Sequence, residues 1–163
     1  MLGRTKAALA GACAIIFAGA LQAATPTPIF LAKAGASDLY ERQASQLVLS
    51  STHDKQIRDF AGEMIRDHTK STQMVKSAAM RSGLHPRPPM LDRAQQGMLA
   101  ALRRAHGADR DRKYLDQQRS AHNQALGLMQ DYAASGSAPA LRKAAADIAP
   151  VVQHHIDMLS RIR

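Results

Sequence analysis

Cysteine, tryptophan and glutamate are scarce in this sequence, and each shortage excludes a class of chemistry. The 163 residues include one cysteine, Cys13, no tryptophan and only two glutamates. Cys13 lies in a segment that we expect to be removed, so the remaining chain has no thiol for a disulfide, a nucleophile or a metal ligand. Stability must then come from an apolar core, which a domain of roughly 140 residues is large enough to bury.

The sequence also lacks an apolar run of the roughly 20 residues that a transmembrane helix needs. The run 7–20 is uncharged, follows Arg4 and Lys6, and leads to Ala23, a small residue of the kind that a signal peptidase requires. We therefore predict a cleaved signal peptide over 1–23 and a periplasmic or otherwise exported protein. A lipoprotein acylated at Cys13 is the alternative, which the very short apolar run before that residue disfavours.

Strand-like alternation is almost absent after residue 28, and apolar residues recur instead at helical spacing. A Pro/Thr linker is expected over 24–28 and one helical domain over 29–163. The predicted helices run over about 29–50, 54–83, 91–104, 109–135 and 138–163. Four long helices and one short one suit a bundle with a single long crossover, so we expect an all-α, ferritin-like antiparallel four-helix bundle with a short extra helix in the crossover.

Each long helix carries one ionisable residue on its apolar stripe, namely Glu41, His68, His122 and His155. We favour a structural interpretation, in which these side chains hydrogen-bond one another and avoid the cost of unpaired burial. Three imidazoles and a carboxylate are also able to hold a single first-row metal ion, or another small ligand. A third alternative is that the histidines are partly exposed and have no role. Asp67, beside His68, is expected to point about 100° away, toward a neighbouring helix or solvent.

The shortage of glutamate argues against a di-iron site, which needs four carboxylates and two Glu-x-x-His pairs. No glutamate or aspartate stands three residues before His68, His122 or His155. A nucleophile elbow and a phosphate-binding glycine loop are missing as well. We therefore predict no catalytic residues and a non-enzymatic role, with a mononuclear metal-dependent enzyme or metal-handling protein as the alternative.

The charge is basic, with 22 Lys and Arg against 13 Asp and Glu, a net +9. Basic side chains are dispersed along the chain rather than gathered in a run, which is typical of a solvated surface. Few aromatics and the predicted export argue against nucleic acid as a partner. A second alternative function is an interaction module whose basic surface contacts an anionic envelope polymer or lipid.

Several segments resemble a known family. They are Phe60-Ala61-x-x-Met64-Ile65-x-Asp67-His68, Tyr114-Leu115-Asp116 followed by His122, and Pro150 followed by His155. They are similar to the bacterial exported family catalogued as domain of unknown function 4142, over about residues 29–159. The resemblance implies a ferritin-like bundle in the bacterial envelope and supplies no activity. The chain departs from the family at Ser37-Asp38, where glycine and apolar residues are more usual.

Overall fold

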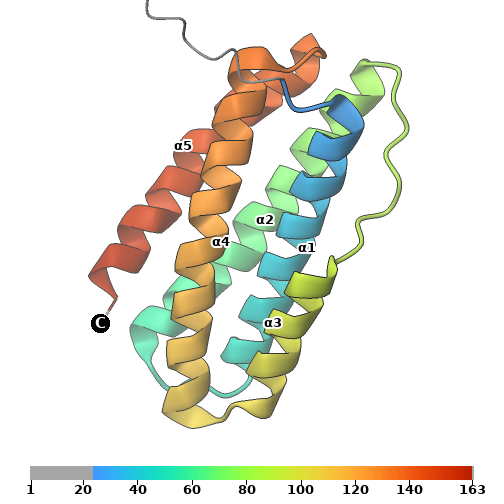
Figure 1. Cartoon of the computed structure of the whole chain (residues 1–163). Coiled ribbons are helices and arrows are strands. Elements are labelled where there is room, and N and C mark those ends of the chain that lie inside the picture. Colours follow the sequence, from blue (N-terminus) through green and yellow to red (C-terminus); the bar gives the residue numbers. More distant parts are fainter. Residues whose placement is uncertain (1–23, 163) are drawn as a thin grey trace, which may run out of the picture.

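The computed structural model describes residues 24–162, which form five α-helices and no strand within that range (Figure 1). The helices are α1 (Thr27–Leu49), α2 (Lys55–Arg81), α3 (Arg93–Arg104), α4 (Gly107–Ser135) and α5 (Pro139–Arg161). The all-α prediction is therefore confirmed. None of the described helices is long and apolar enough to cross a membrane. The predicted signal peptide and the acylation alternative at Cys13 lie outside the described residues.

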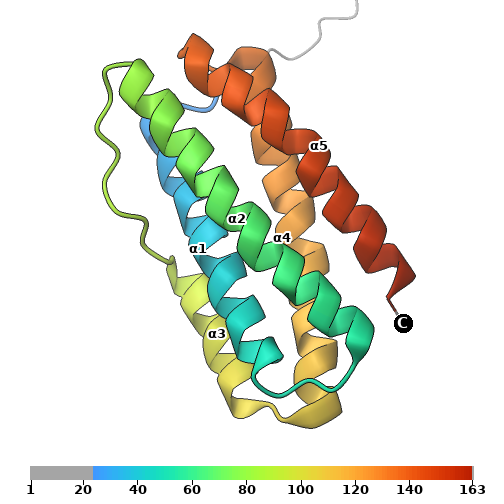
Figure 2. The same cartoon turned by 180° about the vertical axis from the view of Figure 1, so that it is seen from behind.

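The four long helices form two antiparallel hairpins that pack side by side (Figures 1 and 2). α1 pairs with α2 and α4 pairs with α5, while α2 contacts α5 and α1 contacts α4 across the two hairpins. The connection from α2 runs back along the bundle to α3, which packs against α1 and α4. Gly35 permits this course, because a Cβ at that position would lie 3.1 Å from Cβ of Pro89.

Local sequence signals account for several helix ends. The Asp54 carboxylate accepts a hydrogen bond from the Ile57 amide and caps α2. Gly83 ends α2 with φ of +70°, a left-handed conformation that costs glycine nothing. Predicted and observed helix ends differ by at most two residues, and two helices begin earlier than predicted. α1 begins at Thr27, inside the predicted linker, because a proline is tolerated in the first turn. α4 begins at Gly107, two residues before the predicted start.

A layer of polar side chains divides the interior into two apolar clusters. One cluster contains Phe30, Val75, Met129, Tyr132 and Leu141 among its members. The other contains Tyr40, Phe60, Met64, Tyr114 and Leu159 among its members. This layer forms because each long helix switches from apolar to polar near its middle and then back. Its buried members include Asp38, Glu41, His68, Gln118, His122 and His155.

Candidate metal centre

Three histidines from three helices meet in this polar layer. His68 comes from α2, His122 from α4 and His155 from α5, and each is at most 4% exposed. Their ring centroids are 5.3 to 5.6 Å apart. One ring nitrogen of each histidine lies within 4.8 Å of one ring nitrogen of the other two. The three imidazoles are therefore close enough together to bind one ion.

The other ring nitrogen of each histidine already has a hydrogen-bond acceptor. Nδ1 of His68 lies 2.8 Å from a carboxylate oxygen of Asp38 on α1. Nδ1 of His122 lies 2.9 Å from the backbone carbonyl of Gln118, and Nε2 of His155 lies 3.0 Å from the Asp67 carboxylate. Carbonyl and carboxylate oxygens accept hydrogen bonds, so each of these nitrogens must carry the proton. A metal-ligating histidine usually donates its second N–H in this way, which fixes the tautomer and the ring orientation.

These tautomers leave lone pairs directed into the layer on Nε2 of His122 and Nδ1 of His155, and on Nε2 of His68 once that imidazole loses the second proton that its raised pKa favours. Nε2 of His68 has no hydrogen-bond partner among residues 24–162. Nε2 of His122 and Nδ1 of His155 are 3.3 Å apart, so two neutral imidazoles would direct lone pairs at each other. Two nitrogens bound to one tetrahedral Zn²⁺ at ~2.0–2.1 Å are themselves about 3.3 Å apart. The nitrogens of His122 and His155 are therefore already at the spacing that one cation requires, and a ring nitrogen of His68 lies within 4.8 Å of both.

Burial keeps two of these imidazoles neutral. Burial lowers the pKa of His122 to about 3, and the charge of His68 acts in the same direction. Burial also lowers the pKa of His155 to about 4, although the hydrogen bond to Asp67 opposes this shift. For His68, burial alone would lower the pKa, but the hydrogen bond and charge of Asp38 outweigh it and raise the pKa. Since metal ligation needs an unprotonated imidazole, His122 and His155 are ready to bind at neutral pH.

Glu41 lies beside the three histidines but outside their group of ligand atoms. Its carboxylate oxygen is 3.9 Å from Nδ1 of His122, the nitrogen that is turned away from the other two imidazoles. In the described part of the chain, neither oxygen of Glu41 has a hydrogen-bond partner, and the same holds for the side-chain amide of Gln118. Burial raises the pKa of Glu41 to about 7. The carboxyl group is therefore a poorly compensated charge at alkaline pH.

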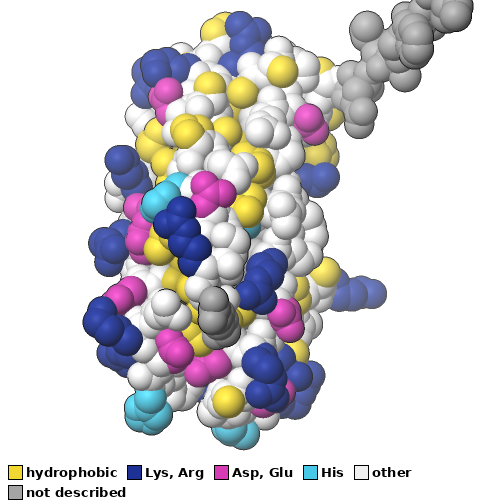
Figure 3. Space-filling model, turned by 90° about the vertical axis from the view of Figure 1, so that its left-hand side faces the viewer, with side chains coloured by type: hydrophobic (Ala, Val, Ile, Leu, Met, Phe, Trp, Pro, Cys, Tyr) yellow, Lys and Arg dark blue, Asp and Glu magenta, His cyan; other side chains and the backbone are white. Residues whose placement is uncertain are grey.

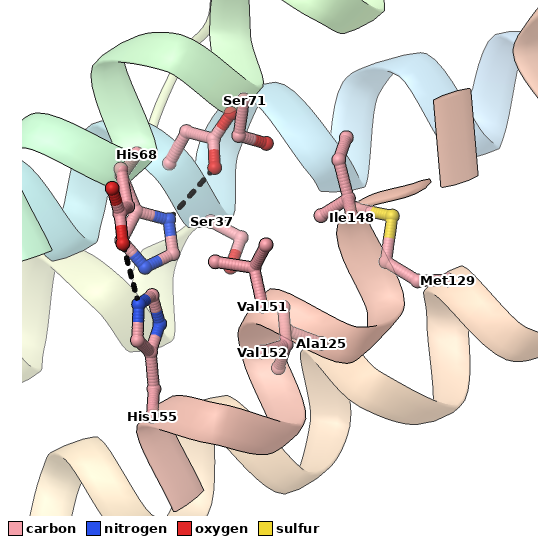
Figure 4. A pocket seen from close by; sticks show the side chains of 11 residues that line it. Ser37, His68, Ser71, Ala125, Met129, Ile148, Val151, Val152 and His155 are labelled. Atoms are coloured by element: carbon pink, nitrogen blue, oxygen red, sulfur yellow. Dashed lines mark hydrogen bonds and ion pairs between the residues drawn. The ribbon is translucent and has the colours of Figure 1, made fainter. Parts of the chain in front are cut away.

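A small cavity adjoins His68 and His155 (Figure 4). Its volume is about 20 Å³, enough for one water-sized species. Asp38 and Asp67 line it with Ser71, and apolar side chains including Val152 close its other side. The structure thus leaves room for one water-sized species beside His68 and His155, two of the three histidines.

Comparison with known proteins places the chain in a family. The model of the domain of unknown function DUF4142 matches residues 16–162. The chain belongs to the DUF4142 family. Membership in DUF4142 confirms the resemblance found in the sequence, and it brings no activity with it. No curated protein is detectably similar to this chain.

Among solved structures, the crystal structure of a DUF305 fragment from Deinococcus radiodurans is similar to this DUF4142 chain. The TM-score is 0.71 and the sequences are 14% identical, over 84% of this chain and 95% of that chain. At this level of identity the similarity shows a shared helical fold and nothing about function.

Of the four residues singled out in the sequence, the structure brings His68, His122 and His155 together and leaves Glu41 to one side. Asp67 contacts a neighbouring helix, through His155 on α5. The sequence reasoning missed Asp38, whose carboxylate accepts the hydrogen bond from Nδ1 of His68. Asp38 lies three residues before Glu41, which places both on the same face of α1, and this spacing could have predicted that Asp38 is buried beside the histidines. The role of the Gln118 carbonyl had no signal in the side-chain pattern, because a backbone atom makes the contact.

Proposed function

We propose that this chain is an exported protein that binds one first-row divalent metal ion through His68, His122 and His155. The proposal rests on one observation: the two ring nitrogens of each histidine have different roles. One nitrogen donates to Asp38, to Asp67 or to the Gln118 carbonyl, and the other faces the remaining imidazoles. A purely structural network would not need acceptors that leave the inward nitrogens of His122 and His155 without protons only 3.3 Å apart.

The ligand set favours zinc or copper over magnesium or calcium. Imidazole nitrogen suits zinc, copper, nickel and iron, whereas magnesium and calcium prefer oxygen ligands. Di-iron chemistry is not part of the proposal, since Glu41 is the one glutamate in the polar layer of the described residues. Tetrahedral coordination would be completed by a water in the adjoining cavity.

We propose a binding role rather than an enzymatic one. Three protein ligands and one open position also occur in catalytic zinc sites, so the ligand count alone does not decide between them. The adjoining cavity of about 20 Å³ accommodates a water but no larger substrate. This small volume supports storage, transfer or sensing of the ion. The long crossover between α2 and α4 of the antiparallel bundle is compatible with a ferritin-like classification of the fold.

Residues 1–23 supply the argument for export, since a short basic stretch is followed by an apolar run and a small residue before position 24. The cell envelope is then the proposed location. In an oxidising compartment, imidazole ligands have an advantage over thiolates because they do not form disulfides.

A thermal melt of the chain from Ala24 onward tests the metal proposal. The protein is stripped with a chelator and titrated in turn with Zn²⁺, Cu²⁺, Ni²⁺, Mn²⁺ and Fe²⁺. At a free concentration of about 100 times Kd, bound metal adds ~2.7 kcal/mol to the unfolding free energy, which raises the melting temperature by several degrees. His68→Ala should abolish the rise, while His53→Ala, at an exposed position, should retain it.

The opposite result is equally clear. If no metal raises the melting temperature, and His68→Ala lowers that temperature in the absence of metal, the histidine layer is a structural network. The metal proposal would then be wrong.

A second candidate is an interaction module for anionic polymers or lipids. It is favoured by a groove of about 300 Å³ between α2 and α5 that Lys70, Arg81 and Lys143 line. Figure 3 shows Lys and Arg side chains spread over one whole face, not confined to a single patch. Such binding should weaken strongly between low and moderate salt, whereas a buried metal site should barely respond.

A further inference from the structure

A second group of ligating side chains lies between the histidine layer and the surface. Glu63, Asp67 and His155 each present a ligand atom within 4.8 Å of the others. The side chain of Glu63 is 27% exposed and that of Asp67 is 32% exposed, whereas that of His155 is 1% exposed. Nε2 of the surface residue His154 lies 3.5 Å from the Glu63 carboxylate. We call Glu63, Asp67 and His154 the outer cluster.

Asp67 connects the outer cluster to the buried site. Its carboxylate contacts Nε2 of His155, whose Nδ1 faces His122 in the inner site. Asp67 also lines the cavity of about 20 Å³ together with His68, His155 and Ser71. The Ser71 hydroxyl in that lining is buried and has no hydrogen-bond partner within the described chain. This hydroxyl and the Asp67 carboxylate both line the cavity. Both are suitable ligands for a cation that passes through it.

We propose that the outer cluster is the entry site through which a metal ion reaches the buried histidines. A divalent cation is first captured at the surface by Glu63 and His154, passes to Asp67, and enters the three-histidine site beside His155 and His68 through the adjoining cavity. This inference rests on the proposed function, since it describes how the ion reaches the same site.

Electrostatics explain why a local entrance is needed. Without Arg4 and Lys6, the chain from Ala24 onward has 20 Lys and Arg against 13 Asp and Glu, a net charge of +7, so its overall field repels a divalent cation. Figure 3 shows acidic and histidine side chains next to one another on a face that carries many Lys and Arg side chains, one of which lies directly against this group. A local acidic site of this kind concentrates a cation, and such focusing raises association rates by 10- to 1,000-fold.

A residue that acts only along the entry path has a distinctive kinetic signature. The ion leaves by the path through which it enters, so substitution of the entry residues Glu63 and His154 slows association and dissociation by the same factor. The dissociation constant, which depends only on the free and bound states, stays unchanged. A permanent ligand behaves differently, because its loss speeds dissociation and weakens affinity.

The experiment uses the chain from Ala24 onward, in which all the described helices lie. Metal-free protein is mixed with Zn²⁺ in a stopped-flow instrument, and zinc binding and release are followed with a chromophoric chelator. The test variant is Glu63→Gln combined with His154→Asn, which leaves Asp67 and its contact with His155 in place. Asp131→Asn, at an exposed position of α4, removes the same unit of charge and is the matched control.

We expect the double variant to associate with Zn²⁺ about tenfold more slowly at low ionic strength and to release it about tenfold more slowly. The dissociation constant should stay within about twofold of the unsubstituted protein, with one ion per chain. The control should change neither rate by more than about twofold.

Three outcomes would contradict the proposed entry through the outer cluster and would leave the proposal of a buried metal site intact. They are unchanged rates in the double variant, a weaker affinity caused by faster release, and two ions per chain at saturation. Failure of the unsubstituted protein to bind Zn²⁺ or any other metal in the melts would instead contradict the proposed function itself.

Discussion

The buried carboxyl group of Glu41 should make the metal-free protein less stable at alkaline pH. Glu41 is 1% exposed, and within residues 24–162 its two oxygens have no hydrogen-bond partner. Burial raises its pKa from 4.5 to about 7 in the folded state. A group with a raised folded pKa stabilises the protein below the unfolded pKa, and this contribution is lost as pH rises through the folded pKa. The loss therefore develops between about pH 4.5 and pH 7.

The size of the effect follows from the shift. Each pKa unit corresponds to ~1.36 kcal/mol, so a shift of about 2.5 units costs roughly 3 kcal/mol once pH exceeds 7. Glutamine has the shape of a protonated glutamate and carries no charge at any pH. Glu41→Gln should therefore raise the unfolding free energy of the metal-free protein by about 3 kcal/mol at pH 8 and by about 1 kcal/mol at pH 5.5.

Urea denaturation of the chelator-treated chain from Ala24 onward, at pH 5.5 and pH 8, measures this difference. Glu63→Gln is the matched control, because it removes the other glutamate from a partly exposed position on α2. We expect it to change the unfolding free energy by less than about 0.5 kcal/mol. If Glu41→Gln instead destabilised the protein at pH 8, the Glu41 carboxylate would have a cationic partner in the folded state, and the reasoning from burial would be wrong.

Two further predictions concern the histidines. Asp38→Asn weakens the acceptor for Nδ1 of His68, and Zn²⁺ affinity in a chelator competition should fall by 10- to 100-fold while the helical circular dichroism is retained. Without metal, stability from the neutral imidazoles is full above pH 6.5 and is lost as pH falls toward the folded pKa values of about 3 for His122 and about 4 for His155. Between pH 6.5 and 5 each loses about 2 kcal/mol, and protonation of Glu41 recovers about 2 kcal/mol. Protonation of His68, whose pKa is raised, also opposes the loss, so urea denaturation should show a net loss of at most about 2 kcal/mol. A net gain of stability toward pH 5 would mean that His122 and His155 are not buried as neutral groups.

Much of the bundle was predictable because its signals are local. Apolar spacing, the Asp54 cap and Gly83 act within one or two turns, so the helices and the approximate positions of their ends follow from neighbouring residues. The errors at Thr27 and Gly107 arose where the local signal is weak. α1 starts after Pro26 and α4 after His106, and neither residue makes a side-chain cap hydrogen bond in the structure.

That His68, His122 and His155 face the interior follows from the sequence alone, because the helical period of 3.6 turns a residue on an apolar stripe inward. The convergence of their nitrogens, the position of Glu41 to one side and the hydrogen bonds that Asp38 and Asp67 accept are visible only in the folded structure. Those facts depend on the axial register between helices that are far apart in sequence. The side chains packed along the whole length of each helix set that register, and no single helix encodes it.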